Sequence, residues 1–498
     1  MKTMICVCIG RGRHKHMIAE HAHLVEQGAQ LVELRLDYIS GDVNLKRLIE
    51  NRPGPVIISC RREADGGKWT GSEADRLVLL RSAIAEGVEY VDLEDDVAKS
   101  IPRYGKTKRI VSLHDFNKTP ADLKEIHDRL VAQEADIVKI ATLANNPHDN
   151  VRMLALIAQS DVPTVGMCMG DMGTPSRVLA GKFGAPFTYA TFHHERALAP
   201  GQLSYNQMKE TYNYEGIGSD SEIFGVIADP IGHSLSPVIH NAAFQDAQMD
   251  RVYVPFRVPQ EHLAQFIKDC PQMGVRGLSV TIPHKESVLK ACTKIDPAVK
   301  GVGAANTIVF SDGEITGYNT DYRAAMASLA EIMKLPDRDR PLDGKLAVVL
   351  GAGGAAKAIA YGLVHRGANV HVAARSPDKA KFFAEKLNCQ IVEWENRHSI
   401  KNADVLVNCT PIGMHPNVDE TPFDKHHLRP SMVVFDTVYN PEQTLLIKQA
   451  REKYCVIVTG VDMFIRQAAI QFQYFTGAGA PNALMRETLK RTIGAIRY

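Results

Sequence analysis

The sequence predicts an α/β protein in which a compact barrel is followed by a second α/β half. Two observations predict this arrangement. Short apolar strands alternate with amphipathic helices over about the first 200 residues. Further along, an apolar strand runs directly into a glycine-rich turn and a helix. At 498 residues the chain is also too long for one ordinary core, so several domains are expected.

The charge balance and the cysteine content indicate which cellular compartment and which classes of binding partner to expect. The chain has 58 basic and 57 acidic residues, a balance that leaves no strong field for nucleic acid or an anionic membrane. Its nine cysteines are dispersed, form no zinc-binding spacing and favour a reducing compartment. No apolar stretch could span a bilayer, and no transit-like segment precedes the first strand. We expect a soluble, cytoplasmic, metal-free protein with small-molecule substrates, and the oligomeric state is left open.

Eight strands are expected before residue 195. They are Met4–Ile9, Leu31–Leu36, Val56–Cys60, Tyr90–Glu94, Ile110–Leu113, Ile137–Ala141, Thr164–Met169 and Phe187–Phe192. Eight strand–helix units in about 200 residues favour a TIM (β/α)8 barrel, with an open doubly wound sheet as the alternative. The catalytic residues of such a barrel are expected at the carboxyl ends of the strands.

One lysine, Lys139, lies inside the apolar run Asp136–Ala141. Burial favours the neutral amine, which can attack a ketone and form a Schiff base. A strand-end lysine that reaches solvent is the simpler alternative. His114 ends the neighbouring predicted strand, about 4.8 Å away. A Schiff base beside a proton carrier is typical of proton abstraction next to a carbonyl, followed by loss of a β substituent.

Three arginines are expected around this lysine. Arg35 and Arg61 follow their strands, and Arg177 lies in the loop after the seventh strand, a favoured anion site in TIM barrels. Together they would bind a carboxylate and help to keep Lys139 neutral. Each of them alone could instead form a surface ion pair.

The second half begins after a polar, glycine-containing segment between about Leu203 and Ser221, which we interpret as a helix end and a linker. Ser236 is placed as the N-cap of an amphipathic helix, with Pro237 at its first position. Ser234 and Ser236 would then form a carboxylate cradle, and plain capping is the alternative. Loops further along carry a lysine, an amide and a carboxylate: Lys285, Asn306 and Asp321.

A dinucleotide-binding motif follows. The strand Lys345–Leu350 runs into Gly351-Ala352-Gly353-Gly354-Ala355-Ala356 and then into a helix. This order predicts a Rossmann phosphate site. The next strand ends in Arg375, Ser376 and Lys379 rather than in the acidic residue that would bind a ribose 2′-hydroxyl. These side chains can bind a 2′-phosphate, so NADP(H) is favoured over NAD(H).

Residues 4–205 resemble the type I 3-dehydroquinate dehydratases. The matching residues are Glu33-Leu34-Arg35, Arg61 with Gly66-Gly67, His114-Asp115-Phe116, Val138-Lys139-Ile140, Ser176-Arg177 and Ala199-Pro200-Gly201-Gln202. The resemblance implies that Lys139 forms the imine and that His114 moves the protons. It implies substrate contacts from Glu33, Arg35, Arg61, Asp65, Arg177 and Gln202.

Two positions depart from that family's pattern. Asp65 stands where relatives often carry a glutamate that supports the histidine, and Leu198 stands where many carry a hydroxyl residue. Because neither residue forms the covalent intermediate, we expect weaker substrate contacts rather than an inactive site.

Residues 222–498 resemble shikimate dehydrogenase. The matching segments are 279–285, 303–307, 317–321, 408–414 and 436–441, together with the glycine turn. The resemblance implies that Lys285 and Asp321 are the acid/base pair. It implies substrate contacts from Ser234, Ser236, Thr281, Asn306, Tyr439 and Gln467. The implied NADP(H) contacts are Gly351, Ala352, Gly353, Gly354, Ala355, Arg375, Ser376, Lys379, Thr410 and Gly460.

The whole chain therefore resembles the family of bifunctional 3-dehydroquinate dehydratase/shikimate dehydrogenases, in which the first reaction makes the substrate of the second. We predict a dehydratase barrel at 1–205, a linker at 206–221, a dehydrogenase substrate domain at 222–335 and 465–498, and a Rossmann NADP-binding domain at 336–464. One alternative is a catalytically inactive, metabolite-sensing regulator with the same folds, against which the intact Lys139, His114, Lys285 and Asp321 argue. The other is a quinate-specific dehydrogenase, against which Ser234 and Ser236 argue.

Overall fold

The computed structural model describes residues 3–232 and 234–495, which form two compact units. The first unit contains residues 1–237 and 247–275, and the second contains 238–246 and 276–498. Both units combine strands with helices, so the predicted α/β class is confirmed.

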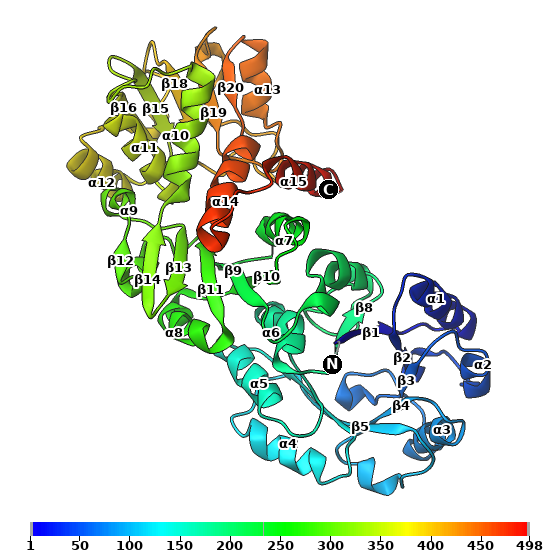
Figure 1. Ribbon diagram of the computed structural model, residues 1–498. Helices are drawn as coiled ribbons and strands as arrows, with labels where there is room; N and C mark the ends of the chain where they lie inside the picture. The colour runs from blue at the N-terminus through cyan, green and yellow to red at the C-terminus, as the bar shows by residue number, and fades with distance from the viewer. Residues whose placement is uncertain (1–2, 233, 496–498) are drawn as a thin grey trace. The chain divides into compact units, whose positions relative to one another are not determined.

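Eight parallel strands form a nearly closed barrel in the first unit, in the blue to green-cyan part of Figure 1. They are β1 (Met4–Ile9), β2 (Leu31–Arg35), β3 (Val56–Ser59), β4 (Tyr90–Glu94), β5 (Lys108–Asp115), β6 (Ile137–Leu143), β7 (Thr164–Met169) and β8 (Phe187–Thr191). Their order is β7-β6-β5-β4-β3-β2-β1-β8. This is the order of a (β/α)8 barrel, so the TIM barrel is confirmed and the open-sheet alternative is wrong.

Helices connect the barrel strands. They are α1 (His14–Glu26), α2 (Leu45–Ile49), α3 (Glu73–Ala85), α4 (Leu123–Val131), α5 (His148–Ala158) and α6 (Thr174–Leu179). Helix α3 shows why such segments begin where they do, because the hydroxyl of its N-cap Ser72 accepts a hydrogen bond from the backbone N–H of Asp75 at 3.1 Å.

Inward-facing side chains change from apolar to polar along the barrel strands. One apolar cluster includes Leu31, Ile57, Ile110 and Ile137. Side chains two residues apart in a strand face the same way, so the next inward positions lie two residues further on. They are Glu33, Ser59, Ser112 and Lys139, and all four are buried. The barrel therefore holds a polar layer next to an apolar one.

Two sequence-based placements were wrong, and one alternative is excluded. Strand β5 continues to Asp115, so His114 lies within the strand rather than at its end. Strand β6 continues to Leu143 and Lys139 is buried inside it, so the alternative of a strand-end lysine that reaches solvent is wrong. Arg177 lies in helix α6 rather than in a loop. Pro175, near the start of α6, suits this position because its missing N–H would lack an intrahelical partner there anyway.

The segment predicted as a linker is packed rather than extended. It contains two short helical turns, Gln207–Thr211 and Tyr214–Gly216. Met208 and Tyr214 are fully buried, and the hydroxyl of Thr3 donates a hydrogen bond to the Tyr214 hydroxyl at 3.1 Å. These turns are too short to show the 3.6-residue periodicity on which sequence prediction relies.

The first unit continues beyond the barrel. Strands β9 (Glu222–Ala228) and β10 (Arg251–Arg257) pair in parallel, and helix α8 (Leu263–Met273) follows. Asp269 of α8 is fully buried, and its carboxylate lies 2.8 Å from His148 Nδ1 at the start of α5. This contact joins α8 to a helix of the barrel.

The second unit begins with short strands and helices. They are α7 (Ser236–Asp246), β11 (Val275–Val280), β12 (Lys294–Ile295), α9 (Pro297–Val302), β13 (Thr307–Ser311), β14 (Glu314–Tyr318) and α10 (Thr320–Met333). Strand β13 pairs antiparallel with both β11 and β14, and β12 pairs in parallel with β14.

A six-stranded parallel sheet follows. Its strands are β15 (Leu346–Leu350), β16 (Asn369–Ala374), β17 (Gln390–Glu393), β18 (Val405–Asn408), β19 (Val433–Asp436) and β20 (Val456–Val458). Their order, β17-β16-β15-β18-β19-β20, is the Rossmann order, so this prediction is confirmed. The helices are α11 (Gly354–His365), α12 (Pro377–Leu387), α13 (Leu445–Glu452), α14 (Gly460–Thr476) and α15 (Asn482–Ala495).

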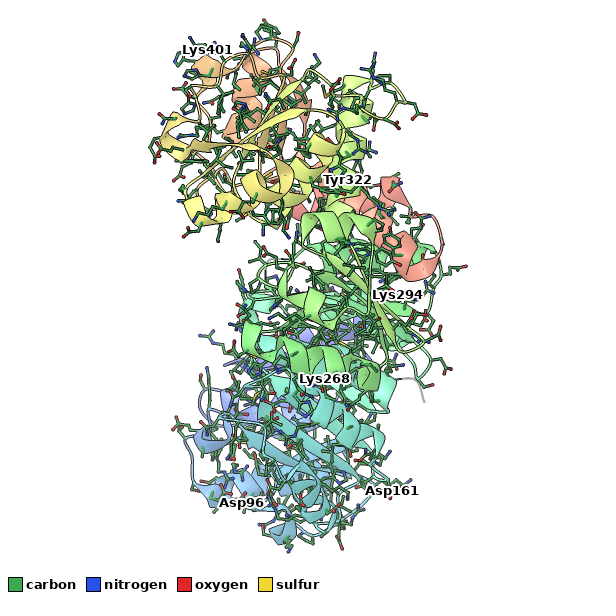
Figure 2. The ribbon with its side chains drawn as sticks, turned by 90° about the vertical axis from the view of Figure 1, so that its left-hand side faces the viewer. Asp96, Asp161, Lys268, Lys294, Tyr322 and Lys401 are labelled. Carbon is green, nitrogen blue, oxygen red and sulfur yellow. The ribbon has the colours of Figure 1, made fainter. Side chains whose placement is uncertain are left out.

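Both faces of this sheet are covered. Ala347 and Val349 of β15 belong to one core cluster and Val348 belongs to another. Tyr322 of α10, labelled in Figure 2, packs edge to face against Tyr361 of α11 with ring centroids 5.4 Å apart. Among residues 3–232 and 234–495, no helix has the length and apolar character needed to cross a membrane.

Candidate active sites

One pocket of the barrel brings together every residue that the sequence placed at the first site. Its lining includes Glu33, Arg35, Arg61, Asp65, His114, Lys139, Arg177 and Gln202. Apolar side chains complete the wall, among them Phe116, Met167, Met169 and Leu198. The side chains come from different barrel strands and loops, so the closed barrel is what assembles the site.

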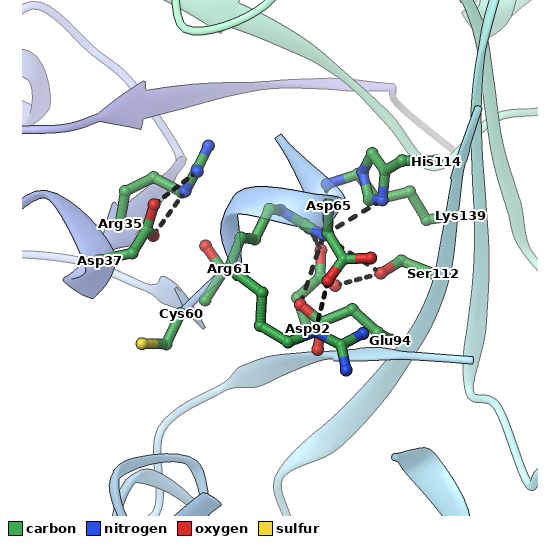
Figure 3. Close-up of polar contacts among 12 residues, drawn as sticks. Arg35, Asp37, Cys60, Arg61, Asp65, Asp92, Glu94, Ser112, His114 and Lys139 are labelled. Carbon is green, nitrogen blue, oxygen red and sulfur yellow. Dashed lines mark hydrogen bonds and ion pairs between the residues drawn. The ribbon is translucent and has the colours of Figure 1, made fainter. Parts of the chain in front are cut away.

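Lys139 is buried among carboxylates (Figure 3). Its Nζ lies 3.0 Å from Asp92 Oδ2 and 3.8 Å from Glu33 Oε1. It also lies 4.0 Å from the centroid of the Tyr189 ring. Its nearest charged neighbours are therefore carboxylates, while the three arginines expected around it line the same pocket. Their effect on the charge of this amine stays a prediction.

Asp92 and Arg61 form the centre of the polar layer. The Arg61 guanidinium pairs with Asp92 and lies 3.8 Å from Glu94 and 4.0 Å from Glu33. Burial raises the pKa of Asp92, but Arg61 and Lys139 outweigh burial and hold the pKa of this carboxyl well below its usual range. Asp92 is thus a buried anion with two cationic partners.

His114 is a neutral imidazole beside Lys139. Burial, together with the charges of Arg61 and Lys139, lowers the pKa of His114 well below its usual range. Arg61 lies 3.2 Å from Nδ1, and the ring stacks at 6.2 Å on Phe116. Ser112, two residues earlier in β5, is the direct cross-strand neighbour of Lys139. A neutral imidazole has one unprotonated nitrogen at which it can accept a proton, and here that nitrogen is Nδ1 when Arg61 donates to it.

Arg35 and Arg177 differ in how their charge is balanced. Arg35 donates two hydrogen bonds to the Asp37 carboxylate, at 2.9 and 2.7 Å. Arg177 is 1% exposed, donates to the Pro200 carbonyl at 3.1 Å, and has no hydrogen-bond partner at Nε within the described residues. Burial lowers its pKa to about 10. A buried guanidinium that lacks a carboxylate partner is a site for an anion.

The two departures from the family pattern both line the pocket. The Asp65 carboxylate accepts a hydrogen bond from Arg62 at 2.6 Å, whereas the guanidinium beside His114 is that of Arg61. Leu198 contributes its backbone N–H, which donates to Gln202 Oε1 at 3.0 Å. The main chain of Leu198 thus orients Gln202 although its side chain cannot donate.

The sequence analysis missed Asp92 and Ser112. Asp92 lies two residues before Glu94 in β4, and Ser112 lies two residues before His114 in β5. Because the side chains of a strand alternate between its faces, Asp92 shares a face with the polar Glu94 and Ser112 shares one with His114. That two-residue period was the signal that could have identified them.

Lys285 and Asp321 form an ion pair in the second unit. Lys285 Nζ donates to Asp321 Oδ2 at 2.6 Å. Lys285 follows β11, and Asp321 lies in the first turn of α10, whose N-cap Asn319 accepts a hydrogen bond from the backbone N–H of Tyr322 at 2.9 Å. Asp321 is buried and Lys285 is half-buried. The predicted acid/base partners are therefore in direct contact.

Asn306 connects α10 to α14. Its amide donates to Thr320 Oγ1 at 2.8 Å and accepts from the Thr320 backbone N–H at 2.7 Å. Gln467 Oε1 lies 3.5 Å from the same hydroxyl. Gln471, one turn later in α14, donates to the Asn306 carbonyl at 3.2 Å and to Thr307 Oγ1 at 2.9 Å. The sequence analysis missed Gln471, although its four-residue spacing from Gln467 places both on one helix face.

The remaining predicted substrate contacts lie in different units. Thr281 directly follows β11, and Tyr439 stacks on Phe464 with ring centroids 4.5 Å apart. Ser236 begins α7 and is buried, and Ser234 is half-buried. The two serines belong to the first unit, whereas Thr281 and Tyr439 belong to the second. A common site for all four stays a prediction.

The turn between β15 and α11 has the features of a phosphate cradle. Gly351 has a φ of +110°, and a Cβ there would lie 3.0 Å from the Cys409 carbonyl oxygen. Gly353 has open space at its Cβ position and caps α11 without a side-chain hydrogen bond. A Cβ on Gly354 would lie 3.0 Å from Lys285 Cδ. The predicted residues Gly351, Ala352, Gly353, Gly354 and Ala355 thus form a backbone turn beside the Lys285–Asp321 pair.

Three predicted side chains follow β16. Arg375 and Lys379 are exposed, and Ser376 makes no side-chain cap for α12. The acidic residue of this turn, Asp378, lies 3.7 Å from Lys381. Two cationic side chains and a hydroxyl at the end of the second Rossmann strand fit a 2′-phosphate.

Thr410 and Gly460 lie near the carboxyl ends of β18 and β20. Thr410 Oγ1 donates to Asn408 Oδ1 at 2.7 Å, and the Asn408 amide donates to Asp436 at 3.0 Å. A Cβ on Gly460 would lie only 2.2 Å from the Val438 carbonyl, so glycine is what lets α14 approach this loop. A contact of either residue with the cofactor stays a prediction. In the described part of the chain, no three His, Cys, Asp or Glu side chains are grouped to hold a metal ion.

Four protein families match separate parts of the chain. Residues 5–219 match type I 3-dehydroquinase, and residues 226–308 match the shikimate dehydrogenase substrate binding domain. Residues 345–437 match the family described as NADP oxidoreductase coenzyme F420-dependent, and residues 460–490 match the shikimate 5′-dehydrogenase C-terminal domain.

Individual relatives cover either the whole chain or its second half. A chloroplastic bifunctional 3-dehydroquinate dehydratase/shikimate dehydrogenase of Arabidopsis thaliana is 38% identical over 98% of this chain and 84% of its own length. A shikimate dehydrogenase (NADP(+)) of Methanothermobacter thermautotrophicus is 37% identical over 56% of this chain and 99% of its own. A shikimate dehydrogenase structure in complex with NADP+ is 36% identical, covers 56% of this chain and 97% of its own, and has a TM-score of 0.51.

Proposed function

Since this chain belongs to the family of bifunctional 3-dehydroquinate dehydratase/shikimate dehydrogenases, we propose that it catalyses two consecutive reactions of the shikimate pathway. The barrel dehydrates 3-dehydroquinate to 3-dehydroshikimate, and the dehydrogenase half reduces this product to shikimate with NADPH. The observation that carries the first assignment is the pocket that holds Lys139, His114 and Arg177 together.

Dehydration begins at Lys139. Its ammonium transfers a proton to the neutral imidazole of His114, and the free amine attacks the ketone carbon. His114 returns this proton to the ketone oxygen and then carries a second proton from the attached nitrogen to the same oxygen. The oxygen leaves as water, and a protonated imine to Lys139 forms. The imine draws electrons from the neighbouring carbon, so His114 can then remove the α proton. His114 passes this proton to the β-hydroxyl group, which then leaves as water. Hydrolysis of the imine releases the product and frees Lys139.

Arg177 holds the substrate carboxylate. Among the three arginines of the pocket, Arg35 is tied to Asp37 and Arg61 is paired with Asp92, whereas Arg177 donates to a carbonyl. An incoming carboxylate therefore gains most from Arg177, since this charge is buried and unneutralised. Glu33, Asp65 and Gln202 are left to bind the ring hydroxyls.

Reduction takes place at Lys285 and Asp321. NADPH, when bound, supplies the hydride to the carbonyl carbon. The ion pair supplies the proton, because Lys285 can donate to the carbonyl oxygen while its hydrogen bond to Asp321 holds it in position. The glycine turn would hold the pyrophosphate, and Arg375, Ser376 and Lys379 would hold the 2′-phosphate that distinguishes NADP(H) from NAD(H).

Two finer assignments belong to this proposal. A cytoplasmic location is supported by nine cysteines that are all free. Shikimate is favoured over quinate by the paired hydroxyls of Ser234 and Ser236, and a quinate dehydrogenase with the same folds is the alternative outcome. A non-catalytic regulator accounts less well for a buried lysine in contact with carboxylates and beside a neutral histidine.

Borohydride reduction tests the dehydratase assignment directly. Addition of borohydride in the presence of 3-dehydroquinate is expected to leave the mass of the reduced adduct on the peptide that contains Lys139. Mass spectrometry of the digested protein locates it. An adduct on another lysine, or inactivation without any adduct, would refute the imine mechanism.

A further inference from the structure

Asp92 occupies the middle of the buried polar layer, and the dehydration steps described above give it no role. It is 1% exposed. One carboxylate oxygen accepts from Ser112 Oγ at 2.6 Å, and the other lies 3.0 Å from Lys139 Nζ and also accepts from Arg61. Figure 3 shows this carboxylate between the arginine and the serine. Both oxygens are thus fixed by side chains from two other strands, β5 and β6, and from the segment that follows β3.

Several other titratable groups face the same space. They are Glu33 of β2, Arg61 just after β3, His114 of β5, Tyr189 of β8 and the two cysteines of β1, Cys6 and Cys8. Burial raises the pKa of both cysteine thiols and of the Tyr189 hydroxyl, so these three are neutral. Glu33 lies 3.8 Å from Lys139 Nζ, beyond hydrogen-bond distance. Asp92 is therefore the anion that hydrogen-bonds this nitrogen directly.

The charge on that nitrogen changes during the reaction. The free amine forms a bond to the ketone carbon with its lone pair, and the C=O electron pair moves to the oxygen, which takes a proton. The nitrogen then gives up one of its two protons, and the resulting hydroxyl receives it. When the C–O bond breaks, the oxygen leaves as water and a nitrogen lone pair completes the C=N bond. The nitrogen keeps one hydrogen and becomes positively charged again, at the position that the ammonium occupied.

We propose that Asp92 is the counterion of this protonated imine and hence a catalytic residue of the dehydratase. This inference rests on the proposed imine chemistry. Asp92 neither gives nor takes a proton; it accepts the remaining N–H of the imine and offsets its charge where water is excluded. Only the protonated imine is a strong electron sink. By keeping the imine protonated, Asp92 therefore raises the upper pH limit at which the α proton can still be removed.

The test is Asp92→Asn, which keeps the shape and removes the charge. Loss of a neighbouring anion lowers the pKa of a cation, so the alkaline limb of the dehydratase pH profile is expected to move down by about 1–3 pH units. The second readout is cyanoborohydride, which reduces protonated imines, with 3-dehydroquinate at stepped pH. The adduct on the Lys139 peptide should disappear at correspondingly lower pH than in the unsubstituted protein.

Two variants separate this role from a structural one. Glu94→Gln removes another buried carboxylate close to Arg61, 3.8 Å away, and should leave the alkaline limb where it was. Asp92→Glu restores the charge and should return the limb to within about half a pH unit even if the rate is lower. An unshifted limb in Asp92→Asn, or an equal shift in Glu94→Gln, would overturn the proposal.

A measurement without substitution covers the case in which Asp92→Asn does not fold. In the unsubstituted protein, labelled with ¹⁵N-lysine and loaded with 3-dehydroshikimate, the imine nitrogen should keep its proton over the whole active pH range. A nitrogen that titrates within that range would refute the role of Asp92 while leaving the imine itself intact. If no imine forms at all, the proposed dehydratase mechanism fails instead.

Discussion

Lys139→Met is expected to lower the dehydratase kcat by on the order of 10⁴-fold or more, because no other group in the pocket can form the imine. Methionine keeps the length and apolar packing of the lysine stem against Tyr189, whose ring lies 4.0 Å from Nζ in the unsubstituted protein. Asp92 keeps Arg61 as a partner, so the barrel should still fold. The formation of 3-dehydroshikimate from 3-dehydroquinate measures the effect.

The second activity of the chain is the internal control for this variant. Reduction of 3-dehydroshikimate with NADPH should change less than about twofold, since Lys139 and the Lys285–Asp321 pair lie in different units. Retention of dehydration within about tenfold of the original rate would mean that the reaction does not pass through a covalent intermediate on Lys139.

Lys285→Met is expected to give the reciprocal result. Loss of the proton donor should lower the reduction of 3-dehydroshikimate by about 10²- to 10⁴-fold, while dehydration persists. The oxidation of NADPH measures the effect. Lys357→Met is a matched control, since this α11 lysine bonds Glu286 at 2.7 Å rather than Asp321. Loss of both activities in Lys285→Met, or an equal loss in Lys357→Met, would contradict the assignment.

Much of the fold could be predicted from sequence because its signals are local. The apolar run within strand Ile137–Leu143 and the glycines of the turn Gly351–Gly354 can each be recognised within a few residues. The alternation of such strands with helices then predicts a barrel and a Rossmann sheet. The helical position of Arg177 was missed because Thr174–Leu179 is only six residues long. The packed segment 206–221 was missed because its turns show no period.

The contacts within the candidate site were harder to predict from the sequence than the fold was. The pairing of Lys139 with Asp92 joins β6 to β4, which are separated by β5 in the sheet. Such a contact exists only when the barrel curves and brings inward side chains together, so no spacing along the chain encodes it. The same closure explains why Arg61 and Lys139 bind the same carboxylate, that of Asp92.

The central claim, that one chain carries two complete and separate active sites, is tested most directly by complementation. Lys139→Met alone and Lys285→Met alone are each incubated with 3-dehydroquinate and NADPH, and the two variants are then mixed under the same conditions. We predict that each variant alone forms shikimate at least about 10²-fold more slowly than the unsubstituted protein, and that the mixture restores its formation, because 3-dehydroshikimate made by one variant is reduced by the other. Shikimate formation by a single variant within about tenfold of the unsubstituted rate, or no gain in the mixture, would contradict this account.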